Sequence, residues 1–157
     1  MSTENLAKGK RAEMLVFGEL VRQRVGLYTP VVDLEGIDAI ARKKDGTFVG
    51  IQVKSTEKEN QAGCFNVWDL DRLGSTEKRF LVCVDTSKEK SGGPIEFWFF
   101  PEDVFKDYAL KVPIKTGASK GSTLYRLDVN SRSRKHGNRL RRDDLKSYLN
   151  AWHLLTS

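Results

Sequence analysis

Two short segments carry side chains that could bind a divalent metal ion beside a phosphate. Residues 33–38 read Asp-Leu-Glu-Gly-Ile-Asp, and after a polar turn residues 51–54 read Ile-Gln-Val-Lys. Asp38 offers a carboxylate, Gln52 an amide oxygen and Lys54 a positive charge. A hard cation held by oxygen ligands stabilises the negative charge that develops on phosphate oxygens during phosphodiester cleavage. These residue types therefore fit metal-dependent phosphodiester hydrolysis, provided that the fold brings them together.

Two adjacent strands are expected to position these groups. The sequence predicts strands over residues 37–42 and 48–55, joined by a tight turn at residues 44–46. In the second strand, apolar and polar residues alternate, and successive strand side chains point to opposite faces. Gln52 and Lys54 therefore share one face, while the alternating valine and isoleucine residues occupy the other.

A helix is expected over residues 7–24, and it adds a second carboxylate. Glu13 lies on its apolar stripe, at helical spacing from Val16, Phe17 and Leu20. The alternative is a surface carboxylate paired with Lys10 or Arg11. Glu19 is the rival helix carboxylate, and it lies nearer the polar flank of the helix. Asp33 and Glu35 could touch a second ion, although capping or turn stabilisation is the favoured interpretation for both.

The remaining pattern predicts an α/β fold. Gly26 is expected to end the first helix, and residues 65–73 do not distinguish a strand from a helix. The further expected elements are strands over 80–84 and 95–100, a short helix over 101–108, an edge strand over 123–129 and a C-terminal helix over 143–155. Together they predict one domain over residues 1–157, with a mixed central β-sheet flanked by helices.

Composition narrows the class of protein and its partners. The 157 residues are 39% hydrophobic and 31% charged, without the long apolar run of a membrane-spanning helix. Two cysteines show no spacing typical of a disulfide framework, which favours an intracellular, cytoplasmic setting. The net charge of +6 favours an anionic partner, although it also fits a lysine surplus that keeps a small domain in solution.

The order Glu13, Gly36-Ile37-Asp38, Gln52-Val53-Lys54 resembles the PD-(D/E)xK nuclease superfamily. Within it, the likeness is to archaeal Holliday junction resolvases and to small, uncharacterised endonuclease-like families. It covers residues 8–56, and more loosely the strands through residue 105. The resemblance implies a restriction-endonuclease-like core of a helix, a three-stranded meander, a helix and a further strand (αβββαβ).

The resemblance also implies roles for individual residues. Asp38 would be the central metal-binding carboxylate, Gln52 would occupy the second, usually acidic, ligand position, and Lys54 would be the catalytic lysine. The backbone carbonyl of Val53 and the Glu13 carboxylate would complete the site for Mg²⁺ or Mn²⁺. Gln52 departs from the commonest pattern, because a neutral amide leaves the site with one less negative charge and weaker magnesium binding.

A basic tract over residues 130–142 is expected to contact DNA. It holds six cationic residues within twelve positions, namely Arg132, Arg134, Lys135, Arg139, Arg141 and Arg142. The alternative is a solvated loop. Trp68 is a candidate for stacking on a base.

These observations lead us to expect a metal-dependent endodeoxyribonuclease that hydrolyses DNA phosphodiester bonds, including those of branched or junction DNA. The alternative is a catalytically inactive DNA-binding or interaction module of the same fold. A nuclease toxin or defence-system component would share the chemistry and differ in biological role. One metal site cuts one strand, so cleavage of two strands calls for a homodimer.

Overall fold

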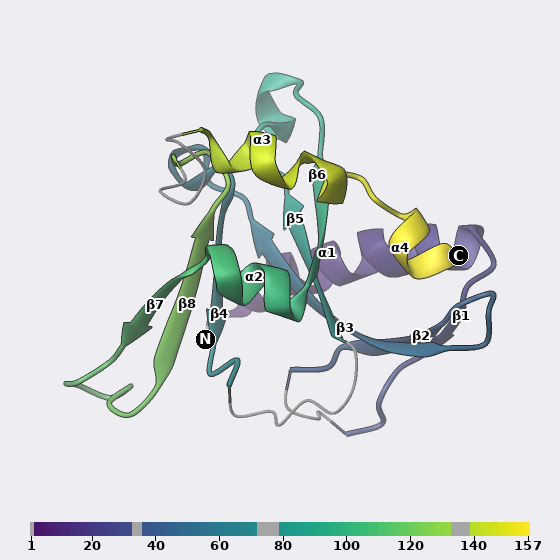
Figure 1. Cartoon of the computed structure of the whole chain (residues 1–157), viewed down its shortest axis with the longest axis horizontal. Coiled ribbons are helices and arrows are strands. Elements are labelled where there is room, and N and C mark those ends of the chain that lie inside the picture. The colour runs from purple at the N-terminus through teal and green to yellow at the C-terminus, as the bar shows by residue number, and fades with distance from the viewer. Residues whose placement is uncertain (1, 33–35, 72–78, 133–138) are drawn as a thin grey trace.

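The computed structural model describes residues 2–32, 36–71, 79–132 and 139–157 (Figure 1). Its first element, α1 (Thr3–Arg22), begins after Ser2, whose hydroxyl accepts a hydrogen bond from the backbone N–H of Asn5 at 3.3 Å. The helix was expected to end at Gly26. Instead Arg24 takes the left-handed conformation, with φ of 60°, and Gly26 opens the first strand.

A five-stranded mixed sheet forms the centre of the molecule, in the order β1-β2-β3-β5-β6. Its strands are β1 (Gly26–Tyr28), β2 (Ala39–Arg42), β3 (Phe48–Thr56), β5 (Arg79–Asp85) and β6 (Glu96–Pro101). β3 runs parallel to β5, and the other neighbouring pairs are antiparallel. The expected mixed α/β sheet is confirmed, and its two expected hairpin strands form β2 and β3.

Two hydrophobic clusters cover the faces of this sheet. On one face, α1 buries Ala12, Val16 and Leu20 against the apolar side chains of β3 and against Val82 and Val84 of β5. On the other face, the intervening β5 residues pack with the second sheet and with α2. β5 is therefore covered on both sides, as its continuous apolar run predicted.

The second sheet has three strands in the order β4-β8-β7, namely β4 (Cys64–Trp68), β8 (Thr123–Asp128) and β7 (Leu110–Pro113). Residues 65–68 of the ambiguous segment 65–73 form part of β4, and residues 72–73 lie outside the described residues. The resemblance placed a second core helix between β3 and β5. The described part of this connection contains β4 instead. β8 is the middle strand of this sheet, so its expected place at a sheet edge was wrong.

The C-terminal region differs from the single helix that was expected over residues 143–155. It consists of α3 (Arg141–Leu145), η3 (Lys146–Tyr148) and α4 (His153–Thr156), while α2 (Glu102–Tyr108) agrees with its expected bounds. Between η3 and α4 the chain follows the edge of β6. Leu149 pairs with Trp98, and Asn150, with φ of 51°, exchanges hydrogen bonds with Phe97. Pairing with the sheet therefore replaces the middle turns of the helix.

None of the helices in the described parts of the chain is long and apolar enough to cross a membrane.

Candidate functional site

Asp38 stands immediately before β2 and forms two hydrogen bonds with β3, one through its backbone and one through its side chain. Its backbone N–H donates to the carbonyl of Ile51 at 2.8 Å, and its Oδ2 accepts a hydrogen bond from the backbone N–H of Val53 at 2.7 Å. Burial raises the pKa of Asp38 above its usual value, and the Val53 hydrogen bond opposes that rise. The carboxylate thus takes the place of a strand carbonyl and has a fixed position.

Gln52 directly precedes Val53 in β3 and is almost fully buried, with 8% of its surface exposed. Its Oε1 is buried and has no hydrogen-bond partner among the described residues. Gly36, with φ of +73°, packs directly against the amide, and a Cβ at this glycine would lie 3.0 Å from Nε2. A buried oxygen without a partner is costly, so this acceptor is available to a cation.

Two further charges influence Asp38. The carboxylate of Glu13 raises the pKa of Asp38, and the ammonium of Lys54 lowers it, which places both groups within electrostatic range of Asp38. Lys54 shares the sheet face of Gln52, because the intervening residues of β3 point toward α1. Glu13 approaches from α1 itself, on the other face.

The structure shows the ion pair that was the alternative interpretation of Glu13, and the metal-binding role of this carboxylate stays a prediction. Its side chain is only 19% exposed and influences Asp38, but it also forms an ion pair with Lys10 at 2.6 Å. The rival Glu19 is engaged by Arg22 at 2.6 Å and by Gln23, and these hydrogen bonds lower its pKa to about 2. The carboxylate of Glu19 is therefore occupied by its neighbours on α1. Asp33 and Glu35 lie outside the described residues.

The oxygen atoms near Asp38 could bind a divalent cation, although few of them belong to carboxylates. Asp38 and Glu13 supply negative charge, and the unpartnered Gln52 Oε1 supplies a neutral oxygen of the kind that Mg²⁺ and Mn²⁺ accept. In the parts of the chain that the structure describes, no cluster of three or more histidine, cysteine or acidic side chains could hold a metal ion. An ion at this place would therefore depend on amide and backbone oxygens as well as carboxylates.

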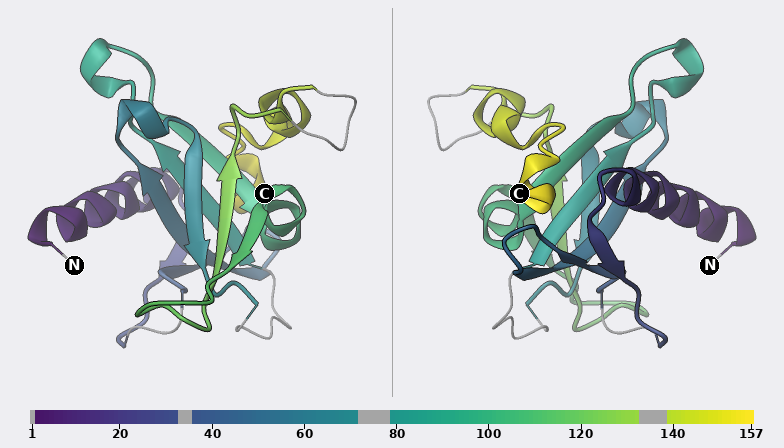
Figure 2. Two further views of the ribbon diagram at one scale, coloured as in Figure 1. Left: turned by 90° about the vertical axis from the view of Figure 1, so that its left-hand side faces the viewer. Right: turned by 90° about the vertical axis from the view of Figure 1, so that its right-hand side faces the viewer.

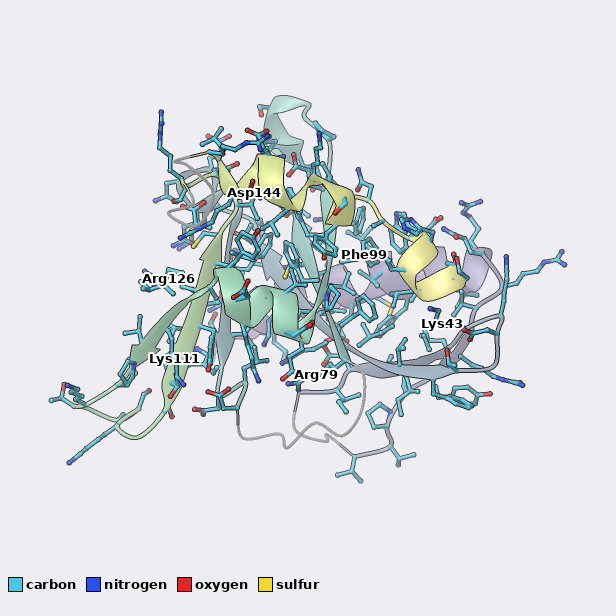
Figure 3. All side chains as sticks on the ribbon, in the orientation of Figure 1. Lys43, Arg79, Phe99, Lys111, Arg126 and Asp144 are labelled. Carbon is cyan, nitrogen blue, oxygen red and sulfur yellow. The ribbon has the colours of Figure 1, made fainter. Side chains whose placement is uncertain are left out.

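Arg79 is a residue of this face that the sequence analysis missed. It opposes Gly50 in the parallel β3–β5 register and is 6% exposed (Figure 3). Its Nε donates to Glu102 at 3.0 Å, and its Nη2 is buried without a hydrogen-bond partner among the described residues. Its place directly before the apolar run of β5 was the available signal.

All six cations of the basic tract were expected to contact DNA, and Arg141 and Arg142 form contacts within the molecule. Arg142 forms two hydrogen bonds with Glu96, both at 2.9 Å, and lies over the Trp98 ring at 5.2 Å. Arg141 donates to the Asp128 carbonyl at 3.3 Å. Arg142 therefore fastens α3 to the central sheet.

Of the other cations of the tract, the structure describes Arg132 and Arg139. Arg139 is exposed. Arg132 pairs with Leu140 through its backbone and lines a cavity with Arg141. Arg134 and Lys135 lie outside the described residues. Arg132 and Arg139 therefore remain candidates for contact with DNA.

The central mixed sheet, flanking helix and paired β2–β3 ribbon have the architecture of the restriction-endonuclease-like fold, to which PD-(D/E)xK nucleases belong. Among solved structures, the chain is similar to the bacterial homing endonuclease I-Ssp6803I, with 25% sequence identity and a TM-score of 0.54. The match covers 98% of this chain and 90% of that one. No family model matches the sequence, and the search of curated proteins found no match. The structural comparison therefore supports the restriction-endonuclease-like fold that the sequence predicted.

Proposed function

We propose that the chain is an endodeoxyribonuclease that depends on Mg²⁺ or Mn²⁺. The observation that carries this proposal is the buried, unpartnered Gln52 Oε1 beside the fixed carboxylate of Asp38. Among the described residues no donor satisfies this buried oxygen, whereas a cation would satisfy it. The similarity to a homing endonuclease over nearly the whole chain supports the same class of reaction.

In this proposal the residues divide the work of phosphodiester hydrolysis. Asp38, Gln52 and the Val53 carbonyl would hold the ion, and Glu13 would contribute from the α1 face, directly or through water. The ion, when bound, stabilises negative charge on the phosphate oxygens. Lys54 orients the attacking water or stabilises the charge of the transition state. The Val53 N–H keeps the Asp38 carboxylate in one orientation, so that its other oxygen is free for the ion.

The substrate is proposed to be DNA, and branched or junction DNA is the form that the superfamily resemblance suggests. Cutting two strands calls for two copies of the site, so a homodimer is part of this proposal. The unpaired thiols of Cys64 and Cys83 support a reducing, cytoplasmic setting.

The test is cleavage of supercoiled plasmid, linear duplex and four-way junction by the purified chain, with Mg²⁺, Mn²⁺ or EDTA. We expect nicking that requires the metal and falls by about a thousandfold or more in Asp38→Asn and in Lys54→Ala. Glu19→Gln is the matched control, because Glu19 lies on the same helix as Glu13 and is engaged on its surface. Metal-independent cleavage, or full activity in Asp38→Asn, would contradict the assignment.

A catalytically inactive DNA-binding module is the second candidate, and Gln52 is the observation that favours it. A neutral amide at this position weakens the attraction for a cation relative to a carboxylate. DNA binding with no cleavage of any substrate in either metal would support this module instead of the nuclease.

A further inference from the structure

The hairpin formed by β7 and β8 is a basic projection that the proposed chemistry does not use. We define the β7–β8 arm as residues 110–123. It contains three lysines, Lys111, Lys115 and Lys120, and no acidic residue. The side chains of residues 115–121 are all exposed.

The arm is an ordered structure almost to its tip. β7 and β8 pair from Leu110 with Arg126 to Pro113 with Thr123. Beyond that ladder, Ile114 still exchanges hydrogen bonds with Ser122 and Gly121, at 2.9 and 3.0 Å. Lys115 and Lys120 lie in the connecting turn, just beyond these last hydrogen bonds.

The root of the arm is fixed to the rest of the molecule by two aspartates. Asp69 exchanges hydrogen bonds with the backbone of Thr123, both at 2.8 Å. Asp71 accepts a hydrogen bond from Tyr125 and forms an ion pair with Lys111 at 3.1 Å. These carboxylates neutralise the root only, so the positive charge of Lys115 and Lys120 is unopposed within the arm.

A chain of ion pairs links this root to the face of the sheet that carries the candidate site. Lys106 lies 3.2 Å from Asp71 and 3.1 Å from Glu102, and Glu102 in turn accepts from Arg79 of β5. The arm is thereby held in a defined orientation relative to β3 and its neighbour β5. Its position is not left to loop motion.

The arm and the segment that leads to Asp38 project from the same end of the molecule. The green tip of the arm and the described residues just after β1 both lie at the lower end in every view (Figures 1 and 2). The β2–β3 turn, marked by Lys43, lies at the opposite side from Lys111 (Figure 3). The arm is therefore placed toward the same end of the molecule as the chain that leads to Asp38, where a long polyanion is able to contact both.

We propose that the β7–β8 arm is a contact for the phosphate backbone of duplex DNA, made through Lys115 and Lys120. This inference rests on the proposed function, because it takes DNA as the partner. Lys115 and Lys120 both lie in the exposed turn of the hairpin, and binding to a phosphate backbone neutralises both charges. It also releases the counterions condensed on the DNA, which makes the contact dependent on salt.

The test measures affinity for a labelled duplex of mixed sequence in EDTA, over a series of KCl concentrations. Loss of two phosphate contacts in Lys115→Gln/Lys120→Gln should lower the slope of log affinity against log salt by about 1.8 and weaken binding about tenfold or more. Lys115→Arg/Lys120→Arg keeps both charges and should bind like the original chain. Lys43→Gln/Lys44→Gln is the matched control, since it removes the same charge from another hairpin turn.

The two proposals fail in different ways. An unchanged salt slope in the arm variant, or an equal loss in the Lys43/Lys44 control, would overturn the arm while metal-dependent cleavage stands. Arm-dependent binding in a chain that cuts no DNA would support the arm and contradict the nuclease. A chain that binds no duplex DNA would overturn the arm directly. Because Lys115 and Lys120 are exposed, thermal unfolding of the two arm variants should coincide with that of the original chain.

Discussion

At the scale of single residues, Gly36 is the position where the candidate site tolerates least change. Its φ of +73° disfavours any side chain, and a Cβ would press on the Gln52 amide at 3.0 Å. We expect Gly36→Ala to lower the free energy of unfolding by about 2 kcal/mol, of which backbone strain supplies about 1 kcal/mol. Urea unfolding measures this loss.

Gly46→Ala is the matched control for that change. Gly46 also has a positive φ, of +86°, but a Cβ there would meet nothing within 4 Å. It therefore isolates the backbone strain, and we expect it to cost about half as much. Equal losses in the two variants would show that the contact with Gln52 does not matter.

The residue pattern predicted the ribbon that carries Asp38, Gln52 and Lys54, because these residues lie on two consecutive strands joined by a short turn. Alternation fixes the face of such strands from local sequence alone. It could not reveal that Arg79 shares this face, since that depends on a parallel pairing between distant segments. It also could not separate Arg142 from the other cations of its tract, because its partners Glu96 and Trp98 are remote in the chain.

At the scale of elements, α3 depends on Arg142 for its attachment to β6. Its side chain is 27% exposed and that of Glu96 only 12%, so loss of the guanidinium leaves a mostly buried carboxylate without its partner. We expect Arg142→Gln to lower the free energy of unfolding by about 2 kcal/mol. Chemical denaturation checks the magnitude.

Arg139→Gln gives the contrasting result. Arg139 is exposed, so we expect stability within about 0.5 kcal/mol of the original chain and a weaker, less salt-dependent affinity for DNA. If Arg142→Gln left stability unchanged and weakened only DNA binding, its structural role would be wrong.

Elements with a strong local pattern were predictable, and those shaped by distant contacts were not. β3 and α2 follow from alternation and from Pro101 before the first turn. The helical spacing of residues 143–155 is genuine, but pairing of Leu149 with Trp98 overrides it. β7 had no prediction at all, because four residues of mixed polarity carry too little signal outside their sheet.

At the scale of the whole molecule, Asp71 joins the arm, α2 and β5 into one network of charges. The hydrogen bond from Tyr125, and then that from Lys111, lower the pKa of Asp71 from its usual 3.8 to about 2. A depressed folded-state pKa means that ionised Asp71 stabilises the fold above pH 3.8, and that this stabilisation is lost as the pH falls toward 2.

The measurement compares urea unfolding of the original chain and Asp71→Asn across this range. We expect the original chain to be more stable at neutral pH, and the difference to shrink as the pH falls below about 4. Glu19 also titrates near pH 2, but it is present in both proteins and its effect cancels. A difference in stability that stays constant down to pH 2 would contradict the role of Asp71.

The parallel pairing of β3 with β5 also bears on how the chain reaches its native state. The β2–β3 hairpin closes over a few residues and can form within microseconds, whereas β5 must return from across the whole β4 segment. Until it does, the ribbon that bears the candidate site residues has one bare edge, open to pairing with another chain. Nascent or partly unfolded molecules are therefore most vulnerable to aggregation at the strand that carries the candidate site.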